Sequence, residues 1–379
     1  MERIYMDYAA TTFCKDEVIE AMQPYWKGCF GNASALYESG RTAGQAVDAA
    51  RKIFAQGLGA ASKKEIYFTS CGTESDNWAL KGVMDANRNR GNHLITTAAE
   101  HHAVLHTCEW LAHHGCEVTV LPVDRFGMVT ARQIQEAIRP ETVLVSVIYA
   151  NNEVGSINPI AEIGKVTREA EVIFHTDAVQ AVGCLPIDVT EYGIDLLSLS
   201  AHKFYGPKGT GVLYCRSGIK MASFMHGGAQ EHERRAGTEN VAGIVGAATA
   251  YALAQHGMKS EGKRLSALRD AMFALVKERI PEAVFHGHMQ MRLPGNVNLS
   301  IPGIPSEAAL LDLDLAGIEC SSGSACTSGS IEPSHVLLAM GVPQSEAKSA
   351  LRFTFGATTT KEQIETVVQR LCILAGRKE

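Results

Sequence analysis

The sequence predicts an α/β protein with a large domain built on a mainly parallel sheet and a smaller α+β domain. Strand-sized apolar runs alternate with helical segments between about residues 60 and 260, and this βαβ rhythm is typical of a parallel sheet with helices on both faces. From about residue 260 the order becomes mixed. A chain of 379 residues has room for two cores. We therefore predict a large domain at 15–260, with 1–14 and 261–379 forming the small domain.

The elements of the large domain are short apolar runs and the helical segments between them. The expected strands lie at 65–70, 94–97, 117–122, 143–149, 172–176 and 194–199. The expected helices lie at 73–86, 103–114, 130–138, 159–170 and, rich in alanine, 238–255. Apolar runs of this length suit strands that are buried on both faces.

The small domain is expected to hold fewer elements in a mixed order. They are a charged helix at 261–279, a strand at 296–301, a helix at 306–314, a strand at 351–355 and a terminal helix. A loop rich in Ser, Gly and Cys, at about 321–332, precedes the last strand. Its small residues and lack of apolar periodicity predict a mobile segment.

Composition and charge exclude several classes of protein. A net charge of −6 gives no reason to expect nucleic-acid binding. The first residues lack the apolar core of a signal peptide, and the longest apolar runs are too short to span a membrane. Ten scattered cysteines form no CxxC pair, so no metal site is expected and most should be free thiols. These features predict a cytoplasmic protein.

Two expected strand ends carry oppositely charged side chains, Asp177 and Lys203. Asp177 closes the apolar run 172–176, and Lys203 follows the run 194–199. Burying either charge without a partner is costly, so each needs a specific use. Desolvation lowers the pKa of a lysine and favours Schiff-base chemistry, while a buried carboxylate suits a protonated pyridinium. The pair predicts pyridoxal 5'-phosphate as the cofactor.

Candidate phosphate ligands lie at two turns. Gly72 and Thr73 lie between the first expected strand and helix, where Gly72 allows close backbone approach, Thr73 can cap the helix and free amides can bind an anion. From that segment alone, an ordinary capped turn is the better interpretation. Ser200 and His202, which flank Lys203, are further candidates for holding the phosphate.

Three more polar side chains follow expected strands. His101 could lie over an aromatic cofactor and move protons, or it could be only a capping or surface histidine. Asn152 could bond a cofactor hydroxyl or a substrate carboxylate, or simply form an Asx turn. Gln180 could bond the phenolic oxygen of the cofactor.

Two residues of the predicted small domain complete the set. Cys326 lies in the mobile loop, where an exposed thiol is avoidable unless it is used, so we identify it as a candidate nucleophile. The alternative is an incidental exposed cysteine. Arg352 lies among apolar neighbours in the strand 351–355, and buried arginines are usually paired. Its partner could be a substrate α-carboxylate or a structural aspartate.

Taken together, these residues resemble the group I cysteine desulfurases of the NifS/IscS type. That family belongs to the fold-type I pyridoxal phosphate enzymes, which share the aspartate aminotransferase architecture. The resemblance covers nearly the whole chain, from YMDYAATT at 5–12 to LRFTFG at 351–356. Its most specific motifs are HTDAVQ at 175–180, SAHK at 200–203, RAGTEN at 235–240 and SSGSAC at 321–326.

The resemblance implies how the cofactor is held. Lys203 would bond its aldehyde, Asp177 would pair with the pyridinium nitrogen, and His101 would stack on the ring and shuttle protons. Gln180 would bond the phenolic oxygen. The phosphate would be held by Gly72, Thr73, Ser200 and His202.

The resemblance also implies the reaction and its partners. Asn152 would contact the cofactor and, with Arg352, bind the carboxylate of L-cysteine. Cys326 would take the sulfur as a persulfide, release alanine and pass the sulfur to an iron–sulfur scaffold or another acceptor protein. A transient role for Cys326 as an iron–sulfur ligand is left open. Thr238 would reach the phosphate in the neighbouring subunit of a homodimer.

Three positions depart from the family pattern. Ala33 stands where proline is common, Tyr37 where histidine is common and Cys71 where glycine is usual. None of these changes removes a catalytic group. A related lyase or transaminase, for example one acting on selenocysteine, is a second interpretation, and a non-catalytic scaffold or sulfur carrier is a third. The sequence names neither the sulfur acceptor nor its pathway.

Overall fold

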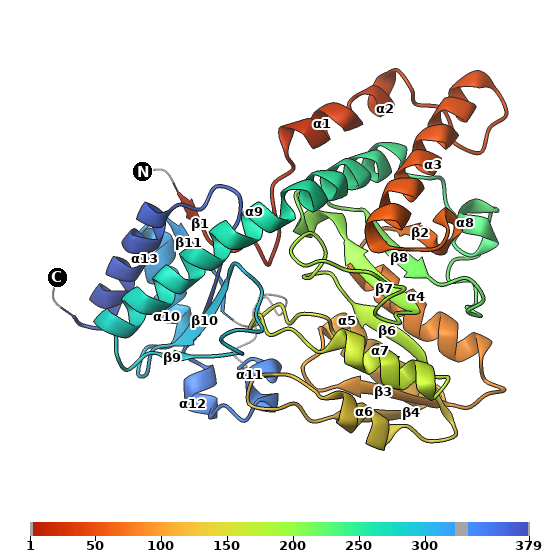
Figure 1. Ribbon diagram of the computed structural model, residues 1–379. Coiled ribbons are helices and arrows are strands. Elements are labelled where there is room, and N and C mark those ends of the chain that lie inside the picture. The colour runs from red at the N-terminus through yellow and green to blue at the C-terminus, as the bar shows by residue number, and fades with distance from the viewer. Residues whose placement is uncertain (1–2, 323–332, 378–379) are drawn as a thin grey trace.

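The structure, a computed structural model, describes residues 3–322 and 333–377 (Figure 1). A large sheet with its helices forms one region, and two small sheets with their helices form the other. The long helix α9 (Val241–Arg279) runs across both regions.

Among the described residues, seven strands form the large sheet, in the order β2-β8-β7-β6-β5-β3-β4. Their bounds are Ile66–Thr69 (β2), His93–Thr97 (β3), Glu117–Leu121 (β4), Thr142–Ser146 (β5), Ile173–Asp177 (β6), Leu196–Ser200 (β7) and Gly211–Cys215 (β8). Neighbours from β7 to β4 are parallel, whereas β8 is antiparallel to β2 and to β7. The α/β fold with a mainly parallel sheet is therefore confirmed.

Strand β8 has no counterpart among the predicted strands. Its five residues are buried between β2 and β7. The run is short and is flanked by Gly209 and Ser217, so the local pattern reads as loop. Its identity as a strand depends on pairing with two partners that are far away in the sequence.

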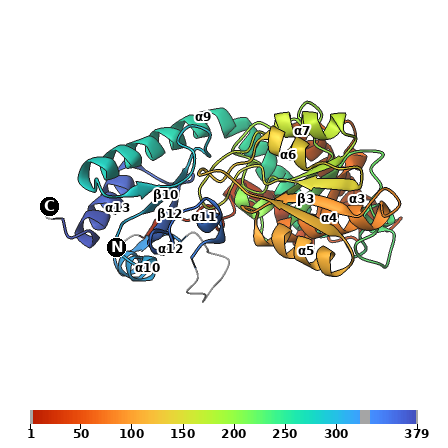
Figure 2. The ribbon, with the colours of Figure 1, turned by 90° about the horizontal axis from the view of Figure 1, so that it is seen from below.

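Helices cover both faces of the large sheet (Figure 2). α4 (Gly72–Ala86) and α5 (His102–His113) lie on one face. α6 (Ala131–Ala137) and α7 (Ile160–Glu169) lie on the other. Side chains of α3 (Glu38–Leu58) belong to the hydrophobic core on that second face. Of these five helices, α3 was not among the predicted elements; its many small residues pack closely against α9.

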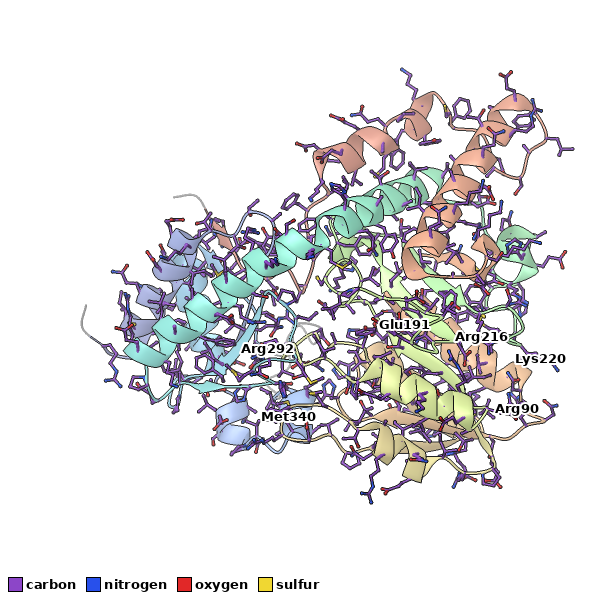
Figure 3. All side chains as sticks on the ribbon, in the orientation of Figure 1. Arg90, Glu191, Arg216, Lys220, Arg292 and Met340 are labelled. Atoms are coloured by element: carbon purple, nitrogen blue, oxygen red, sulfur yellow. The ribbon has the colours of Figure 1, made fainter. Side chains whose placement is uncertain are left out.

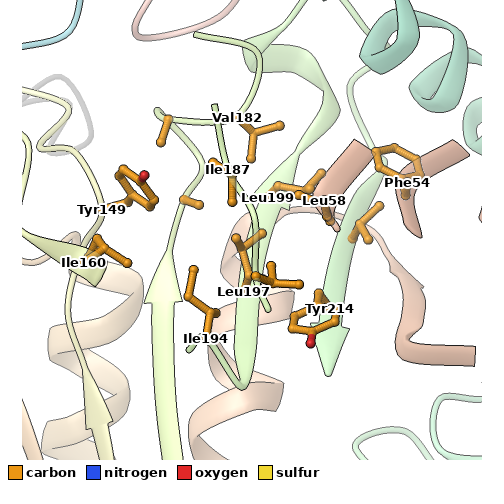
Figure 4. Packing of buried hydrophobic residues seen from close by; sticks show 14 of the residues in the cluster. Phe54, Leu58, Tyr149, Ile160, Val182, Ile187, Ile194, Leu197, Leu199 and Tyr214 are labelled. Carbon is orange, nitrogen blue, oxygen red and sulfur yellow. The ribbon is translucent and has the colours of Figure 1, made fainter. Parts of the chain in front are cut away.

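Each strand contributes to two hydrophobic cores, because successive side chains point to opposite faces. Leu197 belongs to the core that contains Phe54 and Leu58 of α3 (Figure 4). Leu196 belongs instead to the core that contains Leu80 of α4. Burial of a leucine contributes about 1.5–3 kcal/mol relative to exposure, so both cores hold the strand ends firmly.

Helix α9 replaces the two helices expected at 238–255 and 261–279. It spans 39 residues without interruption, through residue 260. No proline interrupts it, and Gly257 costs only about 1 kcal/mol in a helix, so packing on α3 at one end and on α13 (Lys361–Leu374) at the other keeps it continuous. The predicted break between two helices is wrong. The domain division at 14 and 260 stays a prediction.

The second region has two small sheets among its described residues. One has the antiparallel order β12-β10-β9, and the other pairs β1 with β11 in parallel. The bounds are Ile4–Tyr5 (β1), Val284–Phe285 (β9), Asn296–Ser300 (β10), Ile318–Glu319 (β11) and Ala350–Thr354 (β12). Met6 lies in the same hydrophobic core as Leu265, Leu313 and Phe353, so the N-terminal segment packs with the C-terminal region.

The remaining described helices are short. Their bounds are Asp16–Met22 (α1), Pro24–Lys27 (α2), Gln230–Glu233 (α8), Ser306–Leu315 (α10), His335–Ala339 (α11) and Gln344–Ala347 (α12). Within the described ranges, no helix combines the length and apolarity needed to cross a membrane.

A buried arginine connects the two regions. Arg292, labelled in Figure 3, donates from Nε and Nη2 to the carbonyl oxygen of Val154, at 3.1 and 2.6 Å. The side-chain amide of Asn298 donates to the carbonyl oxygen of Glu153 at 3.1 Å. These bonds hold the loop after β5, which carries Asn152, against the second region.

Candidate functional site

A cavity of about 340 Å³ lies at the carboxyl ends of the parallel strands. This edge is where α/β sheets bind ligands, because the strands are parallel and the turns that follow them meet there. Ten of the predicted site residues line it: Gly72, Thr73, His101, Asn152, Asp177, Gln180, Ser200, His202, Lys203 and Arg352. Tertiary structure therefore gathers residues that are up to 280 positions apart in the sequence.

One corner of the cavity offers donors for an anion. Helix α4 begins at Gly72, where a Cβ would come within 2.6 Å of Val179 Cγ2, so only glycine allows this close approach. The N-cap is Cys71, whose side chain makes no capping bond, so the predicted cap by Thr73 is wrong. The Ser200 Oγ is buried and has no hydrogen-bond partner among the described residues. The open first turn and the hydroxyl together suit a phosphate.

A buried carboxylate lies at the end of β6. Asp177 is 4 % exposed, and its Oδ1 accepts from the Val179 N–H at 2.9 Å. Burial raises the pKa of Asp177 to about 6, although the Val179 bond and the charge of Lys203 oppose this rise. The nearby Asp76 of α4 also lines the cavity, and burial and the charge of Asp177 raise its pKa well above its usual range. The two buried carboxyl groups therefore oppose each other's ionisation.

Asp76 is a site residue that sequence reasoning missed. It lies on the first turns of α4, one turn after Gly72, and its Oδ1 lies 3.6 Å from His175 Nε2. The signal was a carboxylate four positions after the glycine of a candidate phosphate turn. On a helix that spacing places Asp76 on the same face as Gly72.

Ala9 and Ala10 of the N-terminal segment form a wall of the cavity. Lys203 Nζ donates to the carbonyl oxygens of Ala9 and Ala10, at 2.5 and 2.8 Å. Gln180 Nε2 donates to the Ala9 oxygen at 2.9 Å, and His202 Nδ1 lies 3.0 Å from Thr11 Oγ1. Sequence reasoning missed this wall, because its contribution is mainly main-chain carbonyl oxygens, which carry no residue signature.

Two imidazoles in the cavity are neutral. Burial, and then the charge of Lys203, lower the pKa of His101 to about 4 and that of His202 to about 4. His101 is the N-cap of α5, and its Nδ1 accepts from the Ala103 N–H at 3.1 Å. The ring proton therefore lies on Nε2. His101 is thus a capping residue that also lines the cavity, and its stacking on a cofactor stays a prediction.

Arg352 lies in β12, with a side chain that is only 2 % exposed. Its Nη2 donates to Asp7 Oδ1 at 2.7 Å, and its Nη1 donates to the carbonyl oxygen of Asn152 at 3.1 Å. Of the two partners that the sequence left open, the structural aspartate is thus present. Asp7 was not among the predicted site residues.

One predicted residue that the structure describes does not line this cavity, and another lies outside the described residues. Thr238 is exposed and does not line the cavity. Cys326, with any role in iron–sulfur ligation, lies outside the described residues. Within the described ranges, no group of three or more His, Cys, Asp or Glu side chains has an arrangement that could hold a metal ion.

The residues present fit pyridoxal phosphate. The orphaned Ser200 Oγ and the open turn at Gly72 suit its phosphate, while the buried Asp177 carboxylate suits a cationic ring nitrogen. The Lys203 amine lies in the same cavity and can bond an aldehyde. None of these features alone would identify a site for pyridoxal phosphate, but one cavity contains the phosphate corner, the carboxylate and the amine.

Comparison with known proteins gives a family match along the chain. The Aminotransferase class-V family profile matches residues 4–367. The cysteine desulfurase IscS of Methanosarcina thermophila is 52% identical over 367 residues, which are 97% of this chain and 90% of that protein. The cysteine desulfurase NifS of Azotobacter vinelandii is 43% identical over 371 residues, covering 98% and 92%.

Solved structures show the same similarity. A NifS-like protein superimposes with a TM-score of 0.92 at 34% identity, covering 99% of each chain. A structure described as SspA in complex with cysteine superimposes with a TM-score of 0.82 at 36% identity, covering 93% of this chain and 98% of the other. The similarity therefore extends over both regions and includes the cavity between them.

Proposed function

Because the chain belongs to the Aminotransferase class-V family, among the IscS/NifS cysteine desulfurases, we propose that it converts L-cysteine to L-alanine and transfers the sulfur to Cys326. The observation that carries this proposal is the single cavity that combines the Lys203 amine, the buried Asp177 carboxylate, the phosphate corner and the Arg352 guanidinium. Pyridoxal phosphate is the cofactor of this family.

The residues at the strand ends would hold the cofactor. The amides at Gly72 and Thr73, with Ser200 Oγ and His202, take the phosphate. Asp177 would pair with the ring nitrogen and Lys203 would bond the aldehyde. Bound in this way, pyridoxal phosphate supplies an electron sink that weakens the bonds at the α- and β-carbons of the amino acid.

The substrate would be held from the opposite side. Arg352, with the side chain of Asn152, takes the α-carboxylate of L-cysteine and excludes water from it. Lys203 Nζ, once it is free to act as a base, moves the proton from the α-carbon. His101 is neutral at working pH and can exchange the Nε2 proton with the reacting groups.

The sulfur step balances with Cys326 as the acceptor. The Cys326 thiolate attacks the sulfur of cysteine, so an S–S bond forms and the C–S bond breaks. The electron pair of the broken bond stays on carbon, which takes up a proton and leaves as the methyl group of alanine. The products are L-alanine and a persulfide on Cys326, with no external oxidant or reductant.

Mass spectrometry of a single turnover tests this function. We expect one added sulfur on Cys326 and one alanine for each equivalent of L-cysteine. Cys326→Ser should keep its cofactor yet release no sulfur. Cys320→Ser is the matched control, because burial raises the pKa of Cys320 to about 12 and leaves that thiol unreactive. A cofactor-loaded protein that gains no sulfur and forms no alanine would refute the proposal.

A homodimer with Thr238 at the shared site is part of the proposal. The segment 13–37 exposes several large apolar side chains: Phe13, Ile19, Trp26, Phe30, Leu36 and Tyr37. Leu36 is 89 % exposed and Phe30 76 %, which is unusual for a surface that stays in water. A second copy packed on this segment would remove these side chains from water, so their exposure supports the dimer. Sedimentation velocity of the purified protein would reveal a monomer if this is wrong.

The class of sulfur acceptor and the cellular location are also part of the proposal. Two of the relatives carry the names IscS and NifS, and we propose delivery to an iron–sulfur scaffold or a similar acceptor protein. The described cysteines are free thiols, which fits the reducing cytoplasm. Sulfur transfer from radiolabelled L-cysteine to candidate acceptors tests the first part.

A further inference from the structure

The guanidinium of Arg352 is held on two sides before any substrate arrives. Nη2 donates to Asp7 Oδ1 at 2.7 Å, and Nη1 donates to the Asn152 carbonyl oxygen at 3.1 Å. Within the described residues, the buried Nε has no hydrogen-bond partner. The Nε–H and the second hydrogen of Nη2 are therefore the donors of the fork that no described protein group is shown to accept.

Asp7 reaches Arg352 through a fixed main chain. The Tyr5 hydroxyl donates to the carbonyl oxygen of Asp7 at 2.9 Å, and Asp7 forms an isolated parallel bridge with Thr354 of β12. The Thr354 N–H donates to the Met6 carbonyl oxygen at 2.7 Å. Asp7 itself does not line the cavity, so its side chain can act on a substrate only through Arg352.

We infer that Asp7 is a positioning residue, which fixes the plane of the Arg352 guanidinium so that its remaining N–H groups, Nε–H and the second Nη2–H, are presented to the α-carboxylate of the substrate. This inference rests on the proposed function, in which Arg352 binds that carboxylate. A carboxylate binds an arginine in bidentate fashion only when two parallel N–H groups face it, so the orientation of the plane decides the affinity.

Two other roles for Asp7 would have different effects on ligand binding. If Asp7 only neutralised Arg352, removing its charge would leave a more positive guanidinium and strengthen carboxylate binding. If Asp7 only tied the N-terminal segment to β12, its loss would lower stability without changing the choice of ligand. Measuring the Kd of ligands with and without a carboxylate therefore distinguishes a positioning role from these two alternatives.

The experiment compares two ligands that differ by one carboxylate. Cofactor-loaded protein in the Cys326→Ser background, which stops turnover, is titrated with L-cysteine and with cysteamine, and the change in cofactor absorption gives each Kd. We expect Asp7→Ala to weaken L-cysteine binding about tenfold and to leave cysteamine binding unchanged. Asp7→Asn keeps the Oδ1 acceptor and should stay within about threefold of the parent protein.

A matched control removes the carboxylate of another arginine–aspartate ion pair, which lies outside the cavity. Arg370 Nε donates to Asp312 at 2.7 Å, in a part-exposed pair outside the cavity. Asp312→Ala should leave the Kd ratio of the two ligands unchanged. Thermal midpoints of all variants show whether each remains folded, and Asp7→Asn keeps the test valid if Asp7→Ala does not fold.

The Arg352→Ala variant distinguishes a failure of this inference from a failure of the proposed function. If Arg352→Ala leaves the Kd ratio of L-cysteine to cysteamine unchanged, the proposed carboxylate site is wrong and the role of Asp7 falls with it. If Arg352→Ala changes the ratio and Asp7→Ala does not, the function stands and the positioning role is overturned. Tighter L-cysteine binding by either Asp7 variant also overturns it.

Discussion

The two walls of the cavity are built in different ways. The strand-end wall comes from consecutive turns of one parallel sheet and carries Asp177, Ser200 and Lys203. The opposite wall brings together the Asn152 loop and Arg352, and Asp7, outside the cavity, bonds Arg352; the three come from distant parts of the sequence. The first wall follows from the architecture of the sheet, whereas the second exists only when the two regions are packed together.

This difference shows that the groups suited to the cofactor and the groups suited to the substrate lie in different parts of the fold. The groups suited to the cofactor lie at the ends of the sheet strands, where burial raises the pKa of Asp177. The groups suited to the substrate lie where the second region meets the first, so they depend on the junction formed by Arg292, Asn298 and helix α9. The variants below test each wall and the helix that joins them.

Removing the lysine should break the strand-end wall completely. We expect Lys203→Ala to lower turnover by about 10³-fold or more, because both the covalent attachment and the base are lost. The absorption band of the attached cofactor should disappear as well. Lys208→Ala, on the exposed turn nearby, is the control and should retain both signals. Substantial alanine formation by Lys203→Ala would contradict the assignment.

A buried glutamate below the strand-end wall should make stability depend on pH. Burial raises the pKa of Glu100 to about 8, so above pH 4.5 the folded protein holds a proton that the unfolded chain releases. The free energy of unfolding therefore falls as pH rises from about 4.5 to about 8, by up to about 1.4 kcal/mol per pH unit.

Glu100→Gln should reduce this dependence. The amide oxygen still accepts from the Thr97 hydroxyl and the Ile148 N–H, which bond Glu100 at 2.7 and 2.9 Å. Urea unfolding at pH 6 and pH 8 should show a difference in stability that is smaller by about 1–3 kcal/mol than in the parent protein. Glu109→Gln, at an exposed position of α5, is the control. Equal pH dependence in Glu100→Gln and the parent would show that this carboxyl does not titrate as described.

Replacing glycine by alanine in helix α9 should change the stability of the protein in a direction that depends on the position. A Cβ at Gly257 would meet nothing within 4 Å, so Gly257→Ala should stabilise the protein by about 0.5–1 kcal/mol. At Gly243 of the same helix, a Cβ would lie 2.3 Å from Asn240 Nδ2 and 2.5 Å from Thr210 Oγ1. Gly243→Ala should therefore destabilise it. Thermal unfolding checks both, and a loss of stability in Gly257→Ala would mean that α9 bends there.

The sequence by itself determined most of the strand-end wall. Asp177 and Lys203 could be recognised at the ends of apolar runs, because burying a charge without a partner is costly. The parallel sheet followed from the alternation of strands and helices. The mainly parallel sheet and its site edge were thus predictable from local patterns.

Only the tertiary structure decided the rest. Strand β8 and the unbroken helix α9 depend on partners that are distant in the sequence, so local pattern alone did not reveal them. The carbonyl oxygens of Ala9 and Ala10 have no sequence signature, and the spacing of Asp76 from Gly72 does not reveal that Asp76 is buried beside Asp177. The choice of Asp7 as the partner of Arg352 was settled in the same way, because two side chains 345 positions apart meet only when the chain has folded.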